Sequence, residues 1–234
     1  MKVSVWKGGA KGAFQEFDVP RHPSQTVLDV VTYIQRALDP ALAYRYACRV
    51  GMCGSCAMTV NGVPRWTCRT HVDKVVRNDC LSIAPLRNLP VIRDLVTDMG
   101  EFFDKWARAK GQFSGTRSKK EHFHAVKPDS ANRVQVDAAI ECIGCAVCYS
   151  ACDVVAWNPD YLGPAALNRA WTLVKDERDA AKLERLRAIA GDAGCHSCRT
   201  HMSCTERCPK HLSPTASIAG LKREVLKSLV RGEF

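Results

Sequence analysis

Long apolar runs are missing from this chain of 234 residues. A membrane-spanning helix needs about 20 consecutive apolar residues, and the sequence contains no such stretch. Ahead of the strand-like segment Val3–Trp6 stand only Met1 and Lys2, so the apolar core of a secretory signal is also missing. We therefore expect a chain that does not cross a membrane by itself and that stays in a reducing compartment. There, patterned cysteines indicate metal sites rather than disulfides.

Cysteine, in contrast, is abundant, with 13 residues of which most fall into three spaced runs. The first run has Cys-x4-Cys-x2-Cys spacing followed by a distant fourth cysteine, which is typical of a plant-type [2Fe–2S] site. The second is a Cys-x2-Cys-x2-Cys-x3-Cys array, and the third is a bacterial ferredoxin array that lacks one cysteine. The runs are Cys48, Cys53, Cys56 and Cys68; Cys142, Cys145, Cys148 and Cys152; and Cys198, Cys204 and Cys208.

The spacing of the second and third runs predicts how their ligands are shared. In a bacterial two-cluster array, the cysteine at x3 spacing ligates the neighbouring cluster rather than its own. A [4Fe–4S] cluster is therefore expected on the first three cysteines of the second run together with Cys208. Cys152 is then expected to join Cys198 and Cys204 on the other cluster.

That other cluster lacks a fourth cysteine, because the position three residues after Cys198 is His201. A three-ligand [3Fe–4S] cluster is the natural consequence, with two alternatives: His201 ligates a fourth iron, or Cys195 takes the empty place. Otherwise Cys195 and Cys80, which stand outside the pattern, are expected to be small buried apolar residues.

Zinc is the competing metal, since isolated Cys-x2-Cys pairs are common in zinc ribbons. Two features oppose it: the runs of cysteines at x2 spacing, and the glycine-rich loop between Cys48 and Cys56. In that loop Gly51 and Gly54 can adopt a positive φ without strain, so the backbone can fold closely around inorganic sulfide.

Longer motifs give the chain a family resemblance. They are Thr26–Asp29, Leu42–Arg45, Cys48–Met58, Pro90–Met99, Trp157–Leu167 and Cys204–Lys210. With these motifs the chain resembles the iron–sulfur subunit of the succinate dehydrogenase and fumarate reductase family. The resemblance implies electron transfer between a flavin and a quinone through [2Fe–2S], [4Fe–4S] and [3Fe–4S] clusters, in that order, with no catalytic residue on this chain.

The same resemblance implies partners and a location. A separate flavoprotein would hold FAD, and membrane anchor subunits would hold quinone and, in many relatives, haem b. The complex would then lie on the cytoplasmic side of a bacterial inner membrane, with this chain bound peripherally. Trp157 occupies the position of a tryptophan that touches quinone in relatives, with Arg199 and His201 nearby. Core packing for Trp157 and a buried, satisfied His201 are the alternatives.

Two departures from the family pattern raise a second hypothesis for the acceptor. Asp153 stands where proline is common, and Arg199 stands where a histidine is usual. The same three clusters are thus also compatible with a flavoprotein acting on another substrate, or with a soluble thiol/disulfide partner.

The expected fold is α+β in two domains. Residues 1–104 are expected to form a [2Fe–2S] domain of short strands, near 3–6, 14–19, 57–60 and 81–84, and one helix capped by Thr26. The resemblance implies the β-grasp fold of plant-type ferredoxins. Residues 130–234 are expected to form an all-α bacterial two-cluster ferredoxin-like domain, with helices around 183–190 and after Ser213-Pro214.

Between the expected domains, residues 105–129 form a basic linker rich in Lys, Arg, Gly, Ser and His. Its charges lack aromatic residues interleaved at regular spacing, so we expect a solvated or partner-facing segment and no nucleic-acid binding. The formal net charge of +10 would fall to roughly +4 with three clusters that carry about −2 each.

Overall fold

The computed structural model describes residues 1–118 and 120–233 and separates into two units. The first unit contains Met1–Glu101 and Ile143–Ala151, and the second contains Phe102–Cys142 and the chain from Cys152 onward. The units interleave along the sequence, so the predicted domain limits at residues 104 and 129 remain predictions.

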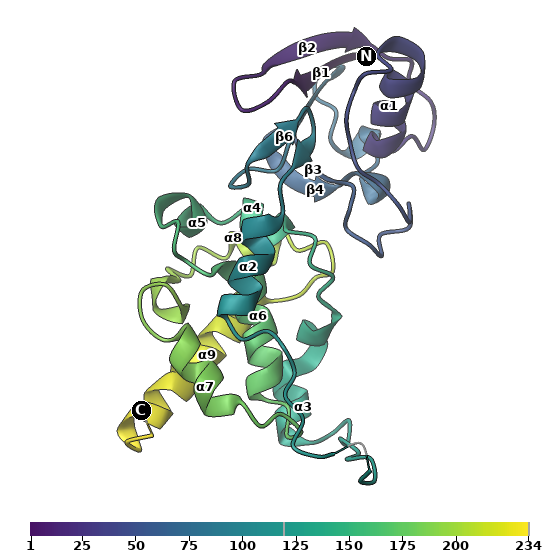
Figure 1. The fold of residues 1–234 in the computed structure, drawn as a ribbon. Coiled ribbons are helices and arrows are strands. Elements are labelled where there is room, and N and C mark those ends of the chain that lie inside the picture. Colours follow the sequence, from purple (N-terminus) through teal and green to yellow (C-terminus); the bar gives the residue numbers. More distant parts are fainter. Residues whose placement is uncertain (119, 234) are drawn as a thin grey trace. The chain divides into compact units, whose positions relative to one another are not determined.

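The first unit is built on a five-stranded mixed sheet with the order β2-β1-β5-β3-β4; Figure 1 labels β1, β2, β3 and β4 of this sheet. β1 runs parallel to β5 and antiparallel to β2, while β3 is antiparallel to both β4 and β5. A two-stranded sheet, β6-β7, lies further along the chain. The strands are β1 (Lys2–Lys7), β2 (Ala13–Asp18), β3 (Ala57–Val60), β4 (Val63–Trp66), β5 (Cys80–Ala84), β6 (Val91–Arg93) and β7 (Val96–Thr97).

Helix α1 (Val27–Tyr33) shares one buried core with this sheet. Val30 and Val31 from the helix and Val3, Val5 and Ile83 from the strands are fully buried together. Alternation of side chains along a strand brings Val3 and Val5 to the same face, against the apolar face of the helix. The expected small sheet with one packed helix is therefore present.

Thr26 begins α1, as the sequence predicted. Its hydroxyl accepts a hydrogen bond from the Asp29 backbone N–H at 3.2 Å, and the Asp29 carboxylate accepts one from the Thr26 N–H at 2.9 Å. This reciprocal pair satisfies two N–H groups that would otherwise lack partners at the helix start. The chain continues as a π-helix, Ile34–Leu38, which shifts the helical spacing and leaves Leu38 43% exposed.

The first unit also contains short helical turns: 3-10 helices at Thr67–Arg69 and Val72–Lys74, and α4 (Val147–Ser150). Hydrogen bonds join α4 to the segment that follows β5. The Arg87 backbone N–H donates to Ser150 Oγ at 2.9 Å, and the Asn88 amide donates to the Tyr149 carbonyl at 3.1 Å.

The second unit is helical. Its longer helices are α6 (Gly163–Val174), α7 (Lys182–Ile189) and α9 (Pro214–Val230), and α6 packs against both of the others. Its shorter elements are α3 (Ala131–Val136), α5 (Asp153–Trp157), α8 (Ser203–Glu206) and 3-10 helices at Asp137–Glu141 and Cys195–Ser197. Helix α2 (Gly100–Arg108) begins in the first unit and continues in the second.

A close approach fixes α6 against α9. A Cβ on Gly220 of α9 would lie 2.5 Å from the ring of Trp171 on α6, so only glycine fits there. Three residues before Gly220 on α9, the Ser217 hydroxyl donates to Asn168 Oδ1 at 2.8 Å, and the Asn168 amide donates to the Ala139 carbonyl at 3.0 Å. This buried chain of hydrogen bonds links three segments of the unit.

Two expectations about individual residues need correction or addition. Cys80 was expected to be buried, but it is exposed, because it is the first residue of β5 and faces solvent while Leu81 and Ile83 face the core. β4 was not predicted; its four residues include Pro64, which disfavours a strand in sequence-based reasoning. Within the described residues, no helix is long and apolar enough to span a bilayer.

Candidate metal centres

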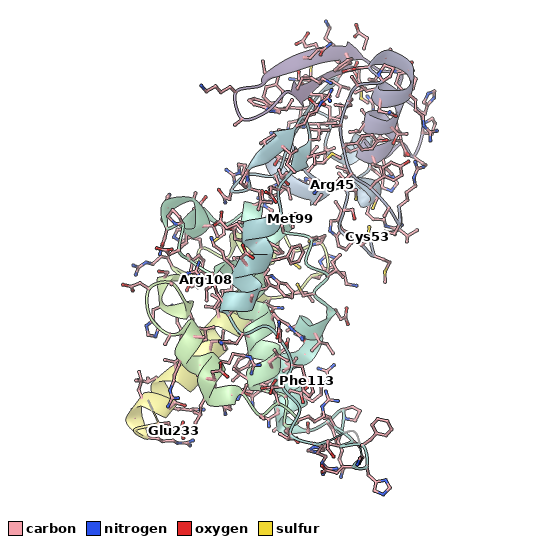
Figure 2. All side chains as sticks on the ribbon, in the orientation of Figure 1. Arg45, Cys53, Met99, Arg108, Phe113 and Glu233 are labelled. Atoms are coloured by element: carbon pink, nitrogen blue, oxygen red, sulfur yellow. The ribbon has the colours of Figure 1, made fainter. Side chains whose placement is uncertain are left out.

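The first cysteine run lies on an irregular loop between α1 and β3, where Figure 2 labels Cys53. Three of its residues have positive φ: Arg49 at 58°, Gly51 at 74° and Gly54 at 73°. A Cβ on Gly51 would lie 2.8 Å from the Trp66 ring. Both a left-handed backbone and close packing therefore require glycine here, as the sequence suggested.

The left-handed turns direct backbone N–H groups toward sulfur. Cys48 Sγ accepts from the N–H groups of Val50 at 3.5 Å, Met52 at 3.2 Å and Cys53 at 3.3 Å. The Cys48 N–H in turn donates to Cys53 Sγ at 3.5 Å. Donors of this kind stabilise thiolate, the form that ligates iron, so the loop fits a [2Fe–2S] cluster.

The four thiols of this run sit in two different environments. The Cys48 N–H and the Ser55 hydroxyl lower the pKa of Cys53 to about 6. Burial, with Cys56 beside it, raises the pKa of Cys68 to about 12. A bound metal cation would offset the cost of ionising the buried Cys68, because a thiol that coordinates a metal is deprotonated. Cys48 and Cys53 are thus at the more open side, and Cys56 and Cys68 are at the buried side.

The buried side of this loop meets the second cysteine run. A Cβ on Gly54 would lie 2.4 Å from Cys145 Cβ and 2.9 Å from Cys145 Cα. Cys56, Cys68 and Val147 share one small apolar cluster, against which Cys145 and Ile143 pack. Sequence reasoning did not predict this contact, since residues 54 and 145 are far apart in the chain.

The second predicted ligand set is distributed between the units. Cys145 and Cys148 belong to the first unit, whereas Cys142 and Cys208 belong to the second. This set, like the other two, remains a prediction.

The third predicted set, Cys152, Cys198 and Cys204, lines one pocket in the second unit. The pocket is small and opens to solvent. Cys152 precedes the first turn of α5, Cys204 lies on α8, and Cys198 ends the 3-10 turn Cys195–Ser197. Three sulfurs around one hollow fit a three-iron cluster.

Burial dominates the chemistry of these three thiols. It raises the pKa of Cys152 to about 11, against the opposing effect of the Val155 and Val154 N–H groups. It also raises the pKa of Cys204, whose sulfur lies 3.3 Å from the Thr215 hydroxyl. Burial and these cysteines likewise raise the pKa of Tyr161. Ionising these buried cysteines to thiolates costs free energy, and a bound metal cation offsets that cost.

The polar residues expected beside this cluster are on the pocket rim. Arg199, His201 and Asp153 line the pocket, and Trp157 packs edge-on against the His201 ring, with centroids 5.7 Å apart. Trp157 is 68% exposed, and the His201 side chain is 42% exposed. Core packing of Trp157 and burial of His201 are both wrong for this structure.

Two residues near this pocket were missed in the sequence. Lys222 of α9 donates from Nζ to the Cys198 carbonyl at 2.9 Å, which places a positive charge beside the cysteine. Thr215 contacts both Cys204 and Thr205. The only signal for Lys222 was a lysine beside the apolar positions Ile218, Leu221 and Val225 of a predicted helix. Cys195 is fully buried and is not among the residues that line the pocket.

Comparison with known families assigns both parts of the chain. Residues 2–104 match the family described as a 2Fe-2S iron-sulfur cluster binding domain, and residues 141–213 match the 4Fe-4S dicluster domain. The expected α+β fold and the iron–sulfur cofactors are confirmed by these matches.

Whole proteins agree with the domains. The chain is 35% identical to the fumarate reductase iron-sulfur subunit of Escherichia coli O6:H1 over 92% of this chain and 86% of that protein. It is 36% identical to mitochondrial succinate dehydrogenase [ubiquinone] iron-sulfur subunit 1 of rice, Oryza sativa subsp. japonica, over 86% of this chain and 72% of that protein.

A solved structure, the Mycobacterium smegmatis Sdh1 complex in its apo form, contains a chain that matches with a TM-score of 0.85 and 28% identity. The match covers 97% of this chain and 95% of that one. The alternative of a different enzyme or a thiol/disulfide partner is not favoured by these relatives. The chain therefore belongs to the family of iron–sulfur subunits of succinate dehydrogenase and fumarate reductase, and it is an electron-transfer subunit.

Proposed function

We propose that the chain passes single electrons through three clusters in the order [2Fe–2S], [4Fe–4S], [3Fe–4S]. The [2Fe–2S] cluster is held by Cys48, Cys53, Cys56 and Cys68; the [4Fe–4S] cluster by Cys142, Cys145, Cys148 and Cys208; and the [3Fe–4S] cluster by Cys152, Cys198 and Cys204. Iron–sulfur clusters supply one-electron chemistry. The protein supplies their ligands, hydrogen bonds and burial, which set the potentials.

One observation carries this proposal: the close approach of Gly54 to Cys145. Gly54 lies between two ligands of the first cluster, and Cys145 is a ligand of the second. A side chain at position 54 would separate the two loops, so glycine here keeps two predicted clusters close together. From Cys148 to Cys152 only three residues intervene, which links the second ligand set to the third through the chain.

The donor partner in this proposal is a flavoprotein that holds FAD. The open side of the first loop supports a docking role, because Val50 and Met52 are 60% and 62% exposed there. Arg49, next to Val50 in the chain, is also exposed and stacks over the Tyr46 ring at 4.7 Å. An apolar patch with a cationic rim fits an acidic protein surface.

The acceptor in this proposal is quinone held by membrane anchor subunits, which also carry haem b in one form of the complex. Trp157, Arg199 and His201 are the residues of this chain that we assign to the quinone side. The exposed Trp157 ring supports this assignment, since a large aromatic side chain in water is a common feature of binding sites. The complex then lies against the cytoplasmic face of a bacterial inner membrane.

Purification through a tag on this chain, in mild detergent, tests the proposal. We expect a flavoprotein and a small membrane subunit in the mass spectrum, and EPR signals of all three cluster types in the sample. Recovery of a soluble cysteine-rich partner without a membrane subunit would contradict the acceptor. A sample without a three-iron signal, even after oxidation with ferricyanide in the presence of a chelator, would contradict the third ligand set.

A further inference from the structure

The loop around His201 repeats the backbone of a cysteine-ligand loop. Cys142 and Cys198 have φ/ψ of −62°/125° and −62°/122°. Two residues later, Gly144 and Thr200 have φ of 65° and 60°. Ala146 and Met202 follow with φ/ψ of 59°/5° and 64°/−2°, and each directly precedes a short helix, α4 or α8.

In this repeat, His201 occupies the backbone position of Cys145. Thr200 adopts this left-handed conformation with backbone strain, because it is β-branched, whereas the matching residue of the other loop is Gly144. The backbone therefore presents the His201 side chain toward the corner where a four-iron cluster has its fourth ligand.

A second donor stands beside the imidazole. Asp153 Oδ2 lies 3.8 Å from His201 Nδ1, and both residues line the pocket formed by the three cysteines. Two ligand atoms at about 2.1 Å from one ion lie at most about 4.2 Å apart, so both can bind the same ion. A metal–nitrogen bond is shorter than a metal–sulfur bond. This difference offsets part of the greater length of the histidine side chain relative to cysteine.

The pair does not form a complete metal site alone. Among residues 1–118 and 120–233, no three His, Cys, Asp or Glu side chains converge on a single-ion site. The remaining ligands must therefore be the sulfides on the open face of a three-iron cluster.

We propose that His201 and Asp153 bind a labile fourth iron at the open corner of the third cluster, which then interconverts between three-iron and four-iron forms. This inference rests on the proposed function, because it needs the three-iron cluster on Cys152, Cys198 and Cys204. The charges balance: [3Fe–4S] in its neutral reduced form plus Fe²⁺ gives [4Fe–4S]²⁺, with His201 nitrogen and Asp153 oxygen replacing water on the incoming ion. When the ion leaves, Fe²⁺ is released, one electron passes to the quinone acceptor, and the [3Fe–4S]⁺ form remains.

The test uses the purified complex under anaerobic conditions. The complex is reduced with dithionite, given one equivalent of ⁵⁷Fe²⁺ and desalted. It is examined by Mössbauer spectroscopy and, after mild anaerobic reoxidation without a chelator, by EPR, because only the oxidised [3Fe–4S]⁺ form gives the three-iron signal. We expect the three-iron EPR signal to disappear in proportion to bound ⁵⁷Fe, and the ⁵⁷Fe to show cluster parameters. Ferricyanide with a chelator should restore the three-iron signal.

Matched variants locate the ligands. His201→Leu should keep the three-iron signal in the presence of iron, and Asp153→Asn should weaken iron uptake by about tenfold or more. His196→Leu removes an exposed histidine that does not line the pocket, and it should behave as the unmodified complex. His201→Cys should give a four-iron cluster that the chelator does not reverse, which establishes that the corner is accessible.

Two results would overturn the inference. One is a three-iron signal that survives iron addition in the unmodified complex, with ⁵⁷Fe bound only as adventitious high-spin ion. The other is equal iron uptake in His201→Leu and the unmodified complex. Failure of the proposed function is distinguishable, because the unmodified complex would then show no three-iron signal even after ferricyanide and a chelator are added.

Discussion

Replacing Gly54 with alanine tests the contact between the first two cysteine loops. The new Cβ meets two penalties: a positive φ of 73° and an overlap with Cys145 at 2.4 Å. A left-handed conformation costs a non-glycine residue about 1–2 kcal/mol, and overpacking adds about 1–3 kcal/mol. The total loss of stability should be about 2–5 kcal/mol. Because the neighbour is the backbone and Cβ of Cys145, that cysteine must move.

Gly62 provides the matched control. It has a φ of 77°, but a Cβ there meets nothing within 4 Å. Gly62→Ala should therefore cost only the conformational penalty, about 1–2 kcal/mol. The difference between the two variants isolates the contact with Cys145.

The assay is the thermal midpoint of the holoprotein followed by cluster absorption, together with EPR of the [4Fe–4S] centre. For a chain of this size, 1 kcal/mol corresponds to about 2–4 °C, so Gly54→Ala should lower the midpoint further than Gly62→Ala by at least about 2 °C. The [4Fe–4S] signal should weaken only in Gly54→Ala. Equal midpoints and equal signals in the two variants would refute the contact.

Two further predictions concern the second unit. Glu224 accepts from Lys175 at 2.9 Å and pairs with Lys182 at 3.3 Å; burial opposes its ionisation, yet these lysines lower its pKa to about 2 from the usual 4.5. Its stabilisation is therefore complete above about pH 4.5 and is lost as the pH falls toward 2. Glu224→Gln should lower the free energy of unfolding by about 2 kcal/mol, a value discounted because the lysines reach water. The loss in thermal stability should be the same at pH 8 and pH 5. It should also be larger than the loss in Glu184→Gln, which removes the exposed pair with Lys110. A loss that shrinks between pH 8 and pH 5 would contradict the low pKa. Trp157→Leu should slow electron transfer to quinone more than to a soluble dye, because we assign the exposed ring, which packs on His201, to the acceptor side; equal slowing of both reactions would remove Trp157 from the acceptor site.

Local signals account for what the sequence predicted well. Cysteine spacing acts over a few residues, and the Thr26–Asp29 capping box and the Ser213-Pro214 helix start are also local. Glycines in the Cys48–Cys56 loop were predicted to have positive φ for the same reason, and Gly51 and Gly54 do. These features depend on backbone sterics and nearby hydrogen bonds, which a sequence states directly.

Other features depend on segments that are distant in the chain. The Gly54–Cys145 approach, the Lys222 bond to the Cys198 carbonyl and the Asp153–His201 pair each join residues whose contact no local pattern encodes. The solvent-facing position of Cys80 depends on which face of β5 packs against the core. The linker is a similar case: Lys105 and Ala109 are buried because α2 packs into the fold, despite the basic composition around them.

The most direct test of the electron relay uses Cys145→Ser in the purified complex, with a donor that enters at the flavin. Freeze-quenched EPR then follows reduction of the first and third clusters separately. We expect the [2Fe–2S] cluster to be reduced as in the unmodified complex, while reduction of the [3Fe–4S] cluster becomes much slower. Reduction of the [3Fe–4S] cluster at the unmodified rate, with the [4Fe–4S] signal lost, would contradict a relay through Cys145.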